Sequence, residues 1–158
     1  HIVFYGHTKQ GAVMAVALCE QLRLSRRNTE RVAFLVDQHL RHCSAANMRP
    51  ATLKRFLRQD GIGELLELTR IDAMAANGDL AHYDFCMSAL GTIGEEEMRP
   101  RPLITGHDLI EMGLEPGPLF KEILGAVEDA QLEGTISSRD DALGLARARL
   151  KRSDIVDQ

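Results

Sequence analysis

Two sets of histidine and aspartate side chains in this sequence are of types that could hold a metal or act on a phosphate. The first is the adjacent pair His107-Asp108, an arrangement that metal-dependent phosphohydrolases use for two metal ligands. The surrounding residues indicate another role, because Thr105 and Asp108 have the three-residue spacing of a helix capping box. We therefore expect Asp108 to cap a helix rather than to bind a metal.

The second set is His7, His39 and Asp72. His39 falls on the apolar face of an expected helix, and Asp72 shares a face with Leu68 and Ala75, so both side chains are expected to point inward. Helical domains of the HD type bind metals with such residues, but they also need an adjacent His-Asp pair. We expect a polar remnant in which His39 and Asp72 are hydrogen-bonded and no metal is held. A metal-dependent HD-type phosphohydrolase acting through the three residues is the alternative.

Basic residues form the next group of candidates. One cluster surrounds an expected turn between helices, and comprises Arg23, Arg26, Arg27 and Arg31. A second cluster comprises Arg49, Lys54, Arg55 and Arg58, in which Lys54 and Arg58 lie one helical turn apart. Such side chains can neutralise RNA phosphates without reading sequence, although ordinary solvated helix faces look the same. Because no aromatic residues alternate with them, they favour recognition of a folded RNA by shape over binding of a single strand.

The stretch from Leu103 to Gly134 predicts two helices that meet at a tight corner. Gly113 is expected to end the first helix in a left-handed conformation, and Pro118 suits the first turn of the second helix. Gly117 between them is expected to need a backbone conformation that glycine takes easily. The free N–H groups after Gly117, with Lys121 one turn further on, could bind a phosphate. The alternative is a helical hairpin that only packs.

The remaining pattern is helical throughout, and no stretch alternates with a period of two, so we predict an all-α fold. A multi-helix bundle with a partial HD-like segment should occupy residues 1–92, a solvated Gly/Pro-rich linker 93–102, and a small helical-hairpin tail lobe 103–158. The first helix, about 9–22, is Ala- and Val-rich and is expected to be buried. Further helices are expected to follow Ser25, to begin at Pro50, to span 64–76 and 80–90, and to run from Ser138 to about 149.

The composition limits the function classes. The chain has 158 residues and a net charge of −4, with 4% aromatic residues and no Trp, so its core must be mostly aliphatic. Residues 1–75 carry 11 Lys and Arg against 7 Asp and Glu, whereas residues 76–158 carry 8 against 16. A basic first half leaves room for a phosphate-binding face. Three cysteines without a C-x-x-C pair, and no apolar run of membrane-spanning length, predict a cytoplasmic protein without a membrane partner.

Three separated stretches resemble one family. They are FYGHTKQGAVMA at 4–15, LRLSRRNTERVAFLV at 22–36 with MRPATLKRFLR at 48–58, and TGHDLIEMGLEPGP at 105–118 with ILGAVEDAQLEG at 123–134. Their order and spacing are similar to those of the C-terminal region of bacterial class II tRNA nucleotidyltransferases, the CCA-adding enzymes, and of the related poly(A) polymerases.

The resemblance implies that this chain is the C-terminal body and tail of a longer enzyme, which fits a first residue that is not methionine. It implies that the parent adds nucleotides to an RNA 3′ end, using ATP, CTP and Mg²⁺ in an N-terminal catalytic head. Such a head holds its metal ions on a D-x-D pair, and this chain has none, so it should contain no catalytic residue and be inactive alone. The expected partners are tRNA or another RNA and that head. A purely structural helical module for oligomerisation is a further alternative.

With that resemblance, RNA contact becomes the favoured role of two groups of residues. The expected RNA-binding residues are Arg49, Lys54, Arg55, Arg58, Gly117 and Lys121.

Overall fold

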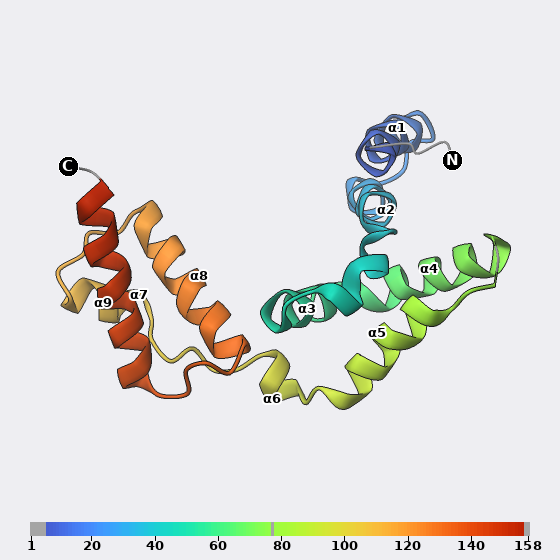
Figure 1. The fold of residues 1–158 in the computed structure, drawn as a ribbon. Helices are drawn as coiled ribbons and strands as arrows, with labels where there is room; N and C mark the ends of the chain where they lie inside the picture. Colours follow the sequence, from blue (N-terminus) through green and yellow to red (C-terminus); the bar gives the residue numbers. More distant parts are fainter. Residues whose placement is uncertain (1–5, 77, 157–158) are drawn as a thin grey trace. The chain divides into compact units, whose positions relative to one another are not determined.

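The computed structural model describes residues 6–76 and 78–156, with side chains described as far as 151. In this part of the chain every regular element is a helix, which confirms the all-α prediction (Figure 1). The contacts divide the chain into two compact units. Unit 1 comprises His1–Met48 and Gln59–Thr92, and unit 2 comprises Arg49–Arg58 and Ile93–Gln158.

Unit 1 is a set of helices that pack in a series: α1 on α2, α2 on α4, α4 on α5, and α5 on the 3₁₀ helix η1. Ser25 caps α2 as predicted, since its Oγ accepts from the Asn28 N–H at 3.3 Å. The buried apolar residues include Ala45, Leu65, Leu66 and Cys86. The bounds are α1 His7–Gln21, α2 Arg26–Gln38, η1 Arg41–Asn47, α4 Ile62–Ala76 and α5 Ala81–Thr92.

Helix α1 is far more exposed than its Ala- and Val-rich sequence predicts. Val13 is 71% exposed and Met14 67%, and Cys19 is the one buried residue of the helix. The prediction of a buried helix is therefore wrong. The apolar residues of α1 are spread around the helix, while its packing is mainly against α2, so one side is covered and the others lie at the surface.

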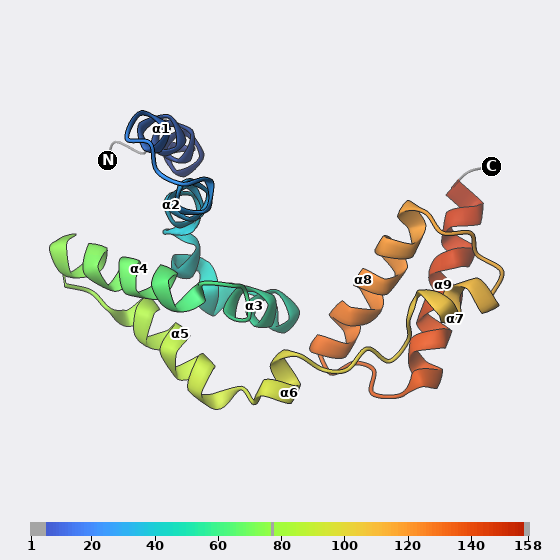
Figure 2. The ribbon, with the colours of Figure 1, turned by 180° about the vertical axis from the view of Figure 1, so that it is seen from behind.

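Unit 2 is built around a core that α7, α8 and α9 share (Figure 2). Its buried members are Ile104, Leu109, Ile123, Val127, Ala142 and Ala146. The small Ala142 and Ala146, one turn apart on α9, allow that helix to approach its neighbours closely. The bounds are α3 Pro50–Leu57, α6 Glu95–Met98, α7 Gly106–Glu111, α8 Pro118–Leu132 and α9 Arg139–Val156.

Both capping pairs predicted for unit 2 are present. The Thr105 N–H donates to the Asp108 carboxylate at 2.6 Å, and the Thr105 hydroxyl donates to the same oxygen at 2.9 Å. Ser138 donates through its hydroxyl to Asp141 at 2.7 Å, while the Asp141 N–H donates back to Ser138 Oγ at 3.1 Å. These pairs define where α7 and α9 begin.

The glycine corner between α7 and α8 confirms one prediction and contradicts another. Gly113 has φ 89°, and the Leu114 N–H donates to the Leu109 carbonyl at 3.1 Å, so α7 ends in the predicted left-handed turn. Gly117 has φ −174° and ψ −171°, an extended conformation open to any residue, so the expectation of a glycine-specific backbone there is wrong. The physical reason is Pro118, which pushes the residue before it towards extended backbone.

Residues 93–102, expected to be a solvated linker, contain α6 and are hydrogen-bonded within unit 2. Arg58 Nη1 donates to the Met98 carbonyl at 3.2 Å, and Gln131 Nε2 donates to the Arg101 carbonyl at 2.8 Å. Helix α3 also belongs to unit 2, although residues 59–92 return to unit 1. The division into a body segment 1–92, a linker 93–102 and a tail lobe 103–158 stays a prediction. None of the described helices has the length and apolar character needed to cross a membrane.

Candidate functional site

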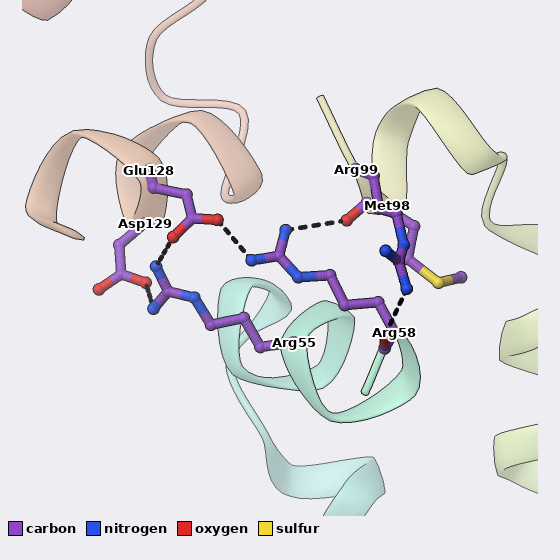
Figure 3. A network of polar contacts seen from close by, with 6 residues as sticks. All are labelled: Arg55, Arg58, Met98, Arg99, Glu128 and Asp129. Atoms are coloured by element: carbon purple, nitrogen blue, oxygen red, sulfur yellow. Dashed lines mark hydrogen bonds and ion pairs between the residues drawn. The ribbon is translucent and has the colours of Figure 1, made fainter. Parts of the chain in front are cut away.

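Four charged side chains join α3 to α8, and we call Arg55, Arg58, Glu128 and Asp129 the ionic clasp (Figure 3). The Arg55 guanidinium pairs with both Glu128 and Asp129. Arg58 pairs with the other oxygen of Glu128, so this carboxylate bridges two arginines. The α6 segment takes part as well, because Arg58 Nη1 donates to the backbone carbonyl of Met98 at 3.2 Å and the Arg99 side chain donates through Nη2 to the Arg58 carbonyl at 2.7 Å.

The ionisation of the clasp reflects this bridging. Burial works to raise the pKa of Glu128, but hydrogen bonds from Arg58 and Arg55 outweigh it and hold that pKa below its ordinary value. Burial works to lower the pKa of Arg55, yet its bonds to Glu128 and Asp129 raise that pKa. Both residues are therefore charged at neutral pH.

Lys54 is the most enclosed of the predicted RNA-binding residues. Its side chain is 10% exposed, and Nζ lies 2.7 Å from Glu97 Oε1 and donates to the Leu132 carbonyl at 2.8 Å. Lys54, Arg55 and Arg58 thus all have acidic partners within unit 2. An RNA phosphate would have to compete with these carboxylates, so the geometry gives the three cations a part in holding α3 on α8.

The other two predicted cations lie in a different setting. Arg49 and Lys121 border a groove of about 710 Å³, together with Arg149 of α9. All three are exposed and have no ion pair or hydrogen bond from their side chains among the described residues. We call Arg49, Lys121 and Arg149 the basic rim. Arg149 was not among the predicted RNA-binding residues, because the sequence shows it only as one of three basic residues near the end of the last helix, with Arg147 and Lys151.

The groove is not purely basic, because Glu122, Asp129 and Glu133 also line it. Asp129 is already paired with Arg55 in the ionic clasp. Gly117 lies at the N-cap of α8, one turn before Lys121, and is exposed. The rim cations and the start of α8 therefore belong to one surface of unit 2.

The three histidine and aspartate candidates of unit 1 do not form a metal site. The His7 and His39 rings meet edge to face with centroids 5.9 Å apart, and His39 Nδ1 lies 2.7 Å from the Val36 carbonyl oxygen. Asp72 is exposed, so the expectation that it points inward is wrong. Asp72 lies in the last part of α4, where every residue from Ile71 to Ala76 except Ala73 is exposed. Among the described residues, no three His, Cys, Asp or Glu side chains are placed to hold a metal ion.

A buried histidine that was not predicted, His42, lies beside His39. His42 is 8% exposed, its Nδ1 lies 2.8 Å from the His39 carbonyl oxygen, and its ring is 6.1 Å from that of His82. Burial lowers the pKa of His42. No periodic signal predicted it, because η1 is a short 3₁₀ helix rather than a continuation of α2.

The His107-Asp108 pair serves local structure, as predicted for Asp108. The His107 side chain is 79% exposed and lies 3.3 Å from Glu111. The Asp108 carboxylate accepts from Thr105 and pairs with Arg139 at the start of α9. Hydrogen bonds from Thr105, followed by that from Arg139, lower the pKa of Asp108.

The family of the chain follows from comparison with known proteins. Residues 3–146 match the family described as "tRNA nucleotidyltransferase domain 2 putative". The chain belongs to this family. The predicted resemblance to the C-terminal region of bacterial class II tRNA nucleotidyltransferases is thereby confirmed.

Curated relatives agree with this assignment. An A-adding tRNA nucleotidyltransferase of Deinococcus radiodurans is 28% identical over 149 residues, covering 88% of this chain and 34% of the relative. A CC-adding tRNA nucleotidyltransferase of Thermus thermophilus is 30% identical over 141 residues, covering 88% of this chain and 32% of the relative. An A-adding tRNA nucleotidyltransferase of Halalkalibacterium halodurans is 57% identical over 47 residues, covering 30% of this chain and 11% of the relative. The chain thus spans about a third of the length of the two relatives that it matches most fully. No solved structure matches it.

Proposed function

We propose that this chain holds RNA for a tRNA nucleotidyltransferase, and that a catalytic head elsewhere in the longer protein adds the nucleotides. The family match over residues 3–146 supports the enzyme class. The observation that carries the RNA contact is the basic rim, in which three exposed cations without acidic partners border one groove of unit 2. Cations placed in this way neutralise phosphates with little cost in broken ion pairs.

The relatives favour a role of this region in holding the RNA over a role in selecting the nucleotide that is added. This region is matched in enzymes named A-adding and in enzymes named CC-adding, which differ in the nucleotide that they add. A segment shared by both kinds fits a task common to them, such as keeping the RNA 3′ end in place. In this proposal ATP, CTP and Mg²⁺ belong to the head.

The ionic clasp has a supporting part in the proposal. Arg49 is the N-cap residue of α3, and Arg55 and Arg58 bind that helix to Glu128 on α8. The clasp therefore fixes Arg49 beside Lys121, which lies on the same α8. Lys54 adds to this by anchoring α3 to Leu132 at the other end of α8.

A titration tests the proposal. The purified chain is titrated with a labelled tRNA that lacks its terminal CCA, over a range of salt concentrations, with inorganic polyphosphate as competitor. We expect saturable binding that weakens as salt rises and that exceeds the binding of polyphosphate at equal charge. Absence of binding at low salt would overturn the proposal, and equal binding of polyphosphate would reduce it to nonspecific charge attraction.

A further inference from the structure

Lys121 and Gly125 lie on a ridge of α8 between two hollows of unit 2. One is the groove of the basic rim, and the other is a cavity of about 900 Å³ between α8 and residues 100–105. Both residues line both hollows. A ligand bound across this ridge would therefore meet a cation-lined groove on one side and the second cavity on the other.

The second cavity differs in character from the groove, and we call it the apolar cavity. Pro102, Leu103, Phe120 and Leu124 contribute to its walls. The phenyl ring of Phe120 is a flat face on which a planar group can stack. Its volume falls within the range of roughly 300–1,000 Å³ that is usual for small-ligand sites.

The cavity also has polar groups placed near its walls. Gln131 lines it and uses its Nε2 to donate to the Arg101 carbonyl at 2.8 Å, which fixes the side chain and leaves Oε1 as an acceptor. Lys121 at the mouth has no ion-pair partner among the described residues. A planar group with hydrogen-bond donors could donate to Gln131 Oε1, and an anion attached to it could neutralise Lys121.

We propose that the apolar cavity receives one unpaired base of the bound RNA, while Lys121 on the ridge holds the phosphate of the same nucleotide. This inference rests on the proposed function and specifies it, because it adds recognition of an unpaired nucleotide to backbone binding. A nucleotide fits better than an apolar segment of a protein partner, since such a segment would cover Lys121 without neutralising it. The charge at the ridge and the apolar walls beside it match the two halves of a nucleotide.

Two hairpin RNAs test the inference. They share one fully paired stem closed by a non-nucleotide linker, but one ends blunt and the other carries one additional unpaired 3′ nucleotide. The chain should bind the hairpin with the unpaired nucleotide about five-fold more tightly or better, as expected for one stacked base.

Gly125→Leu supplies the matched variant. A Cβ at Gly125 meets nothing within 4 Å, and the residue lies inside α8, so the helix should accept a larger side chain. We expect Gly125→Leu to narrow the cavity and abolish the preference; because Gly125 also borders the groove of the basic rim, the quantity compared is the ratio of the affinities for the two hairpins. Gly125→Ala, which adds one methyl group, should keep the preference.

Each outcome separates the inference from the proposed function. Equal affinity of the chain for both hairpins would overturn the base-binding cavity and leave RNA holding intact, whereas binding of neither would overturn RNA holding itself. A preference that survives in Gly125→Leu would place the base elsewhere. If that variant does not fold, a 4-thiouridine at the unpaired position decides: photocrosslinks to residues 100–105 or 120–124 support the cavity, and crosslinks confined to unit 1 contradict it.

Discussion

The guanidinium of Arg31 lies against the backbone of Gly61, and its Nη2 donates to the Gly61 carbonyl oxygen at 2.9 Å. The same group lies 2.7 Å from Glu64 and 5.1 Å from the centroid of the Phe34 ring. Gly61 has φ +74°, and a Cβ there would lie 1.9 Å from Arg31 Nη1. Unit 1 therefore uses a glycine at this position both for its left-handed backbone and for the space that Arg31 occupies.

Replacing this glycine should destabilise unit 1. We expect Gly61→Ala to lower the free energy of unfolding by about 1–2 kcal/mol, since alanine is strained at positive φ and displaces Arg31 from Gly61 and Glu64. Gly63→Ala is the matched control, because a Cβ there meets nothing within 4 Å and the residue lies inside α4, where alanine is favoured. Urea unfolding curves measure both, and equal stability of the two variants would contradict this account.

The two glycines of the α7–α8 corner should respond differently to alanine. Gly113 has φ 89°, so Gly113→Ala should cost about 1 kcal/mol. Gly117 is extended, and a Cβ there meets nothing closer than 3.9 Å, so Gly117→Ala should change stability by less than about 0.5 kcal/mol. Thermal unfolding compares the variants, and a larger loss at Gly117 would show that its extended backbone is wrongly assigned.

The cap of α7 should make unit 2 sensitive to acid. The folded state lowers the pKa of Asp108, so the stability that its carboxylate adds is present above the pKa of an unfolded aspartate, about 3.9, and is lost as pH falls through the folded value. Asp108→Asn should therefore have a lower melting temperature at pH 7, and the difference from wild type should shrink below about pH 4. Asp140→Asn, at an exposed residue in the first turn of α9, is the control and should change less. A difference that stays constant with pH would argue against the ionised cap.

The ionic clasp should stabilise α3 on α8. Glu128→Gln removes the carboxylate that bridges Arg55 and Arg58, and we expect a loss of about 1 kcal/mol, limited because Glu128 is 39% exposed. Glu122→Gln on the same helix is the control, since its exposed side chain has no ion pair among the described residues. The difference between the two variants should decrease at 1 M salt, where exposed charges are screened. A loss at Glu122 as large as that at Glu128 would contradict the clasp.

The sequence was sufficient for features that depend on neighbours a few residues apart. Ser25, the Thr105–Asp108 pair and the Ser138–Asp141 pair mark helix starts through hydrogen bonds spanning three residues, and Gly113 ends a helix through its own backbone freedom. These signals are local, so the helices other than η1 and α6, and their order, could be predicted.

Contacts between distant segments could not be read in the same way. Arg55 and Arg58 pair with Glu128, which lies 73 and 70 residues further along the chain. Nothing near α3 in the sequence indicates that partner. For the same reason, the exposure of Asp72 depends on where neighbouring helices stop covering α4. Arg149 was identifiable as basic, but its place beside Arg49 depends on the packing of α9.

The central claim is that the basic rim binds RNA phosphates, and the salt dependence of tRNA binding tests it most directly. The dissociation constant is measured at several salt concentrations for wild type, for the triple variant Arg49→Ala, Lys121→Ala and Arg149→Ala, and for the control Lys9→Ala on α1. Each lost phosphate contact should lower the slope of log affinity against log salt by roughly 0.7–0.9. We predict that the triple variant binds about ten-fold more weakly or worse at low salt, with a slope reduced by about two and an unchanged melting temperature, whereas Lys9→Ala matches wild type. A triple variant that keeps both the affinity and the slope of wild type would contradict the account.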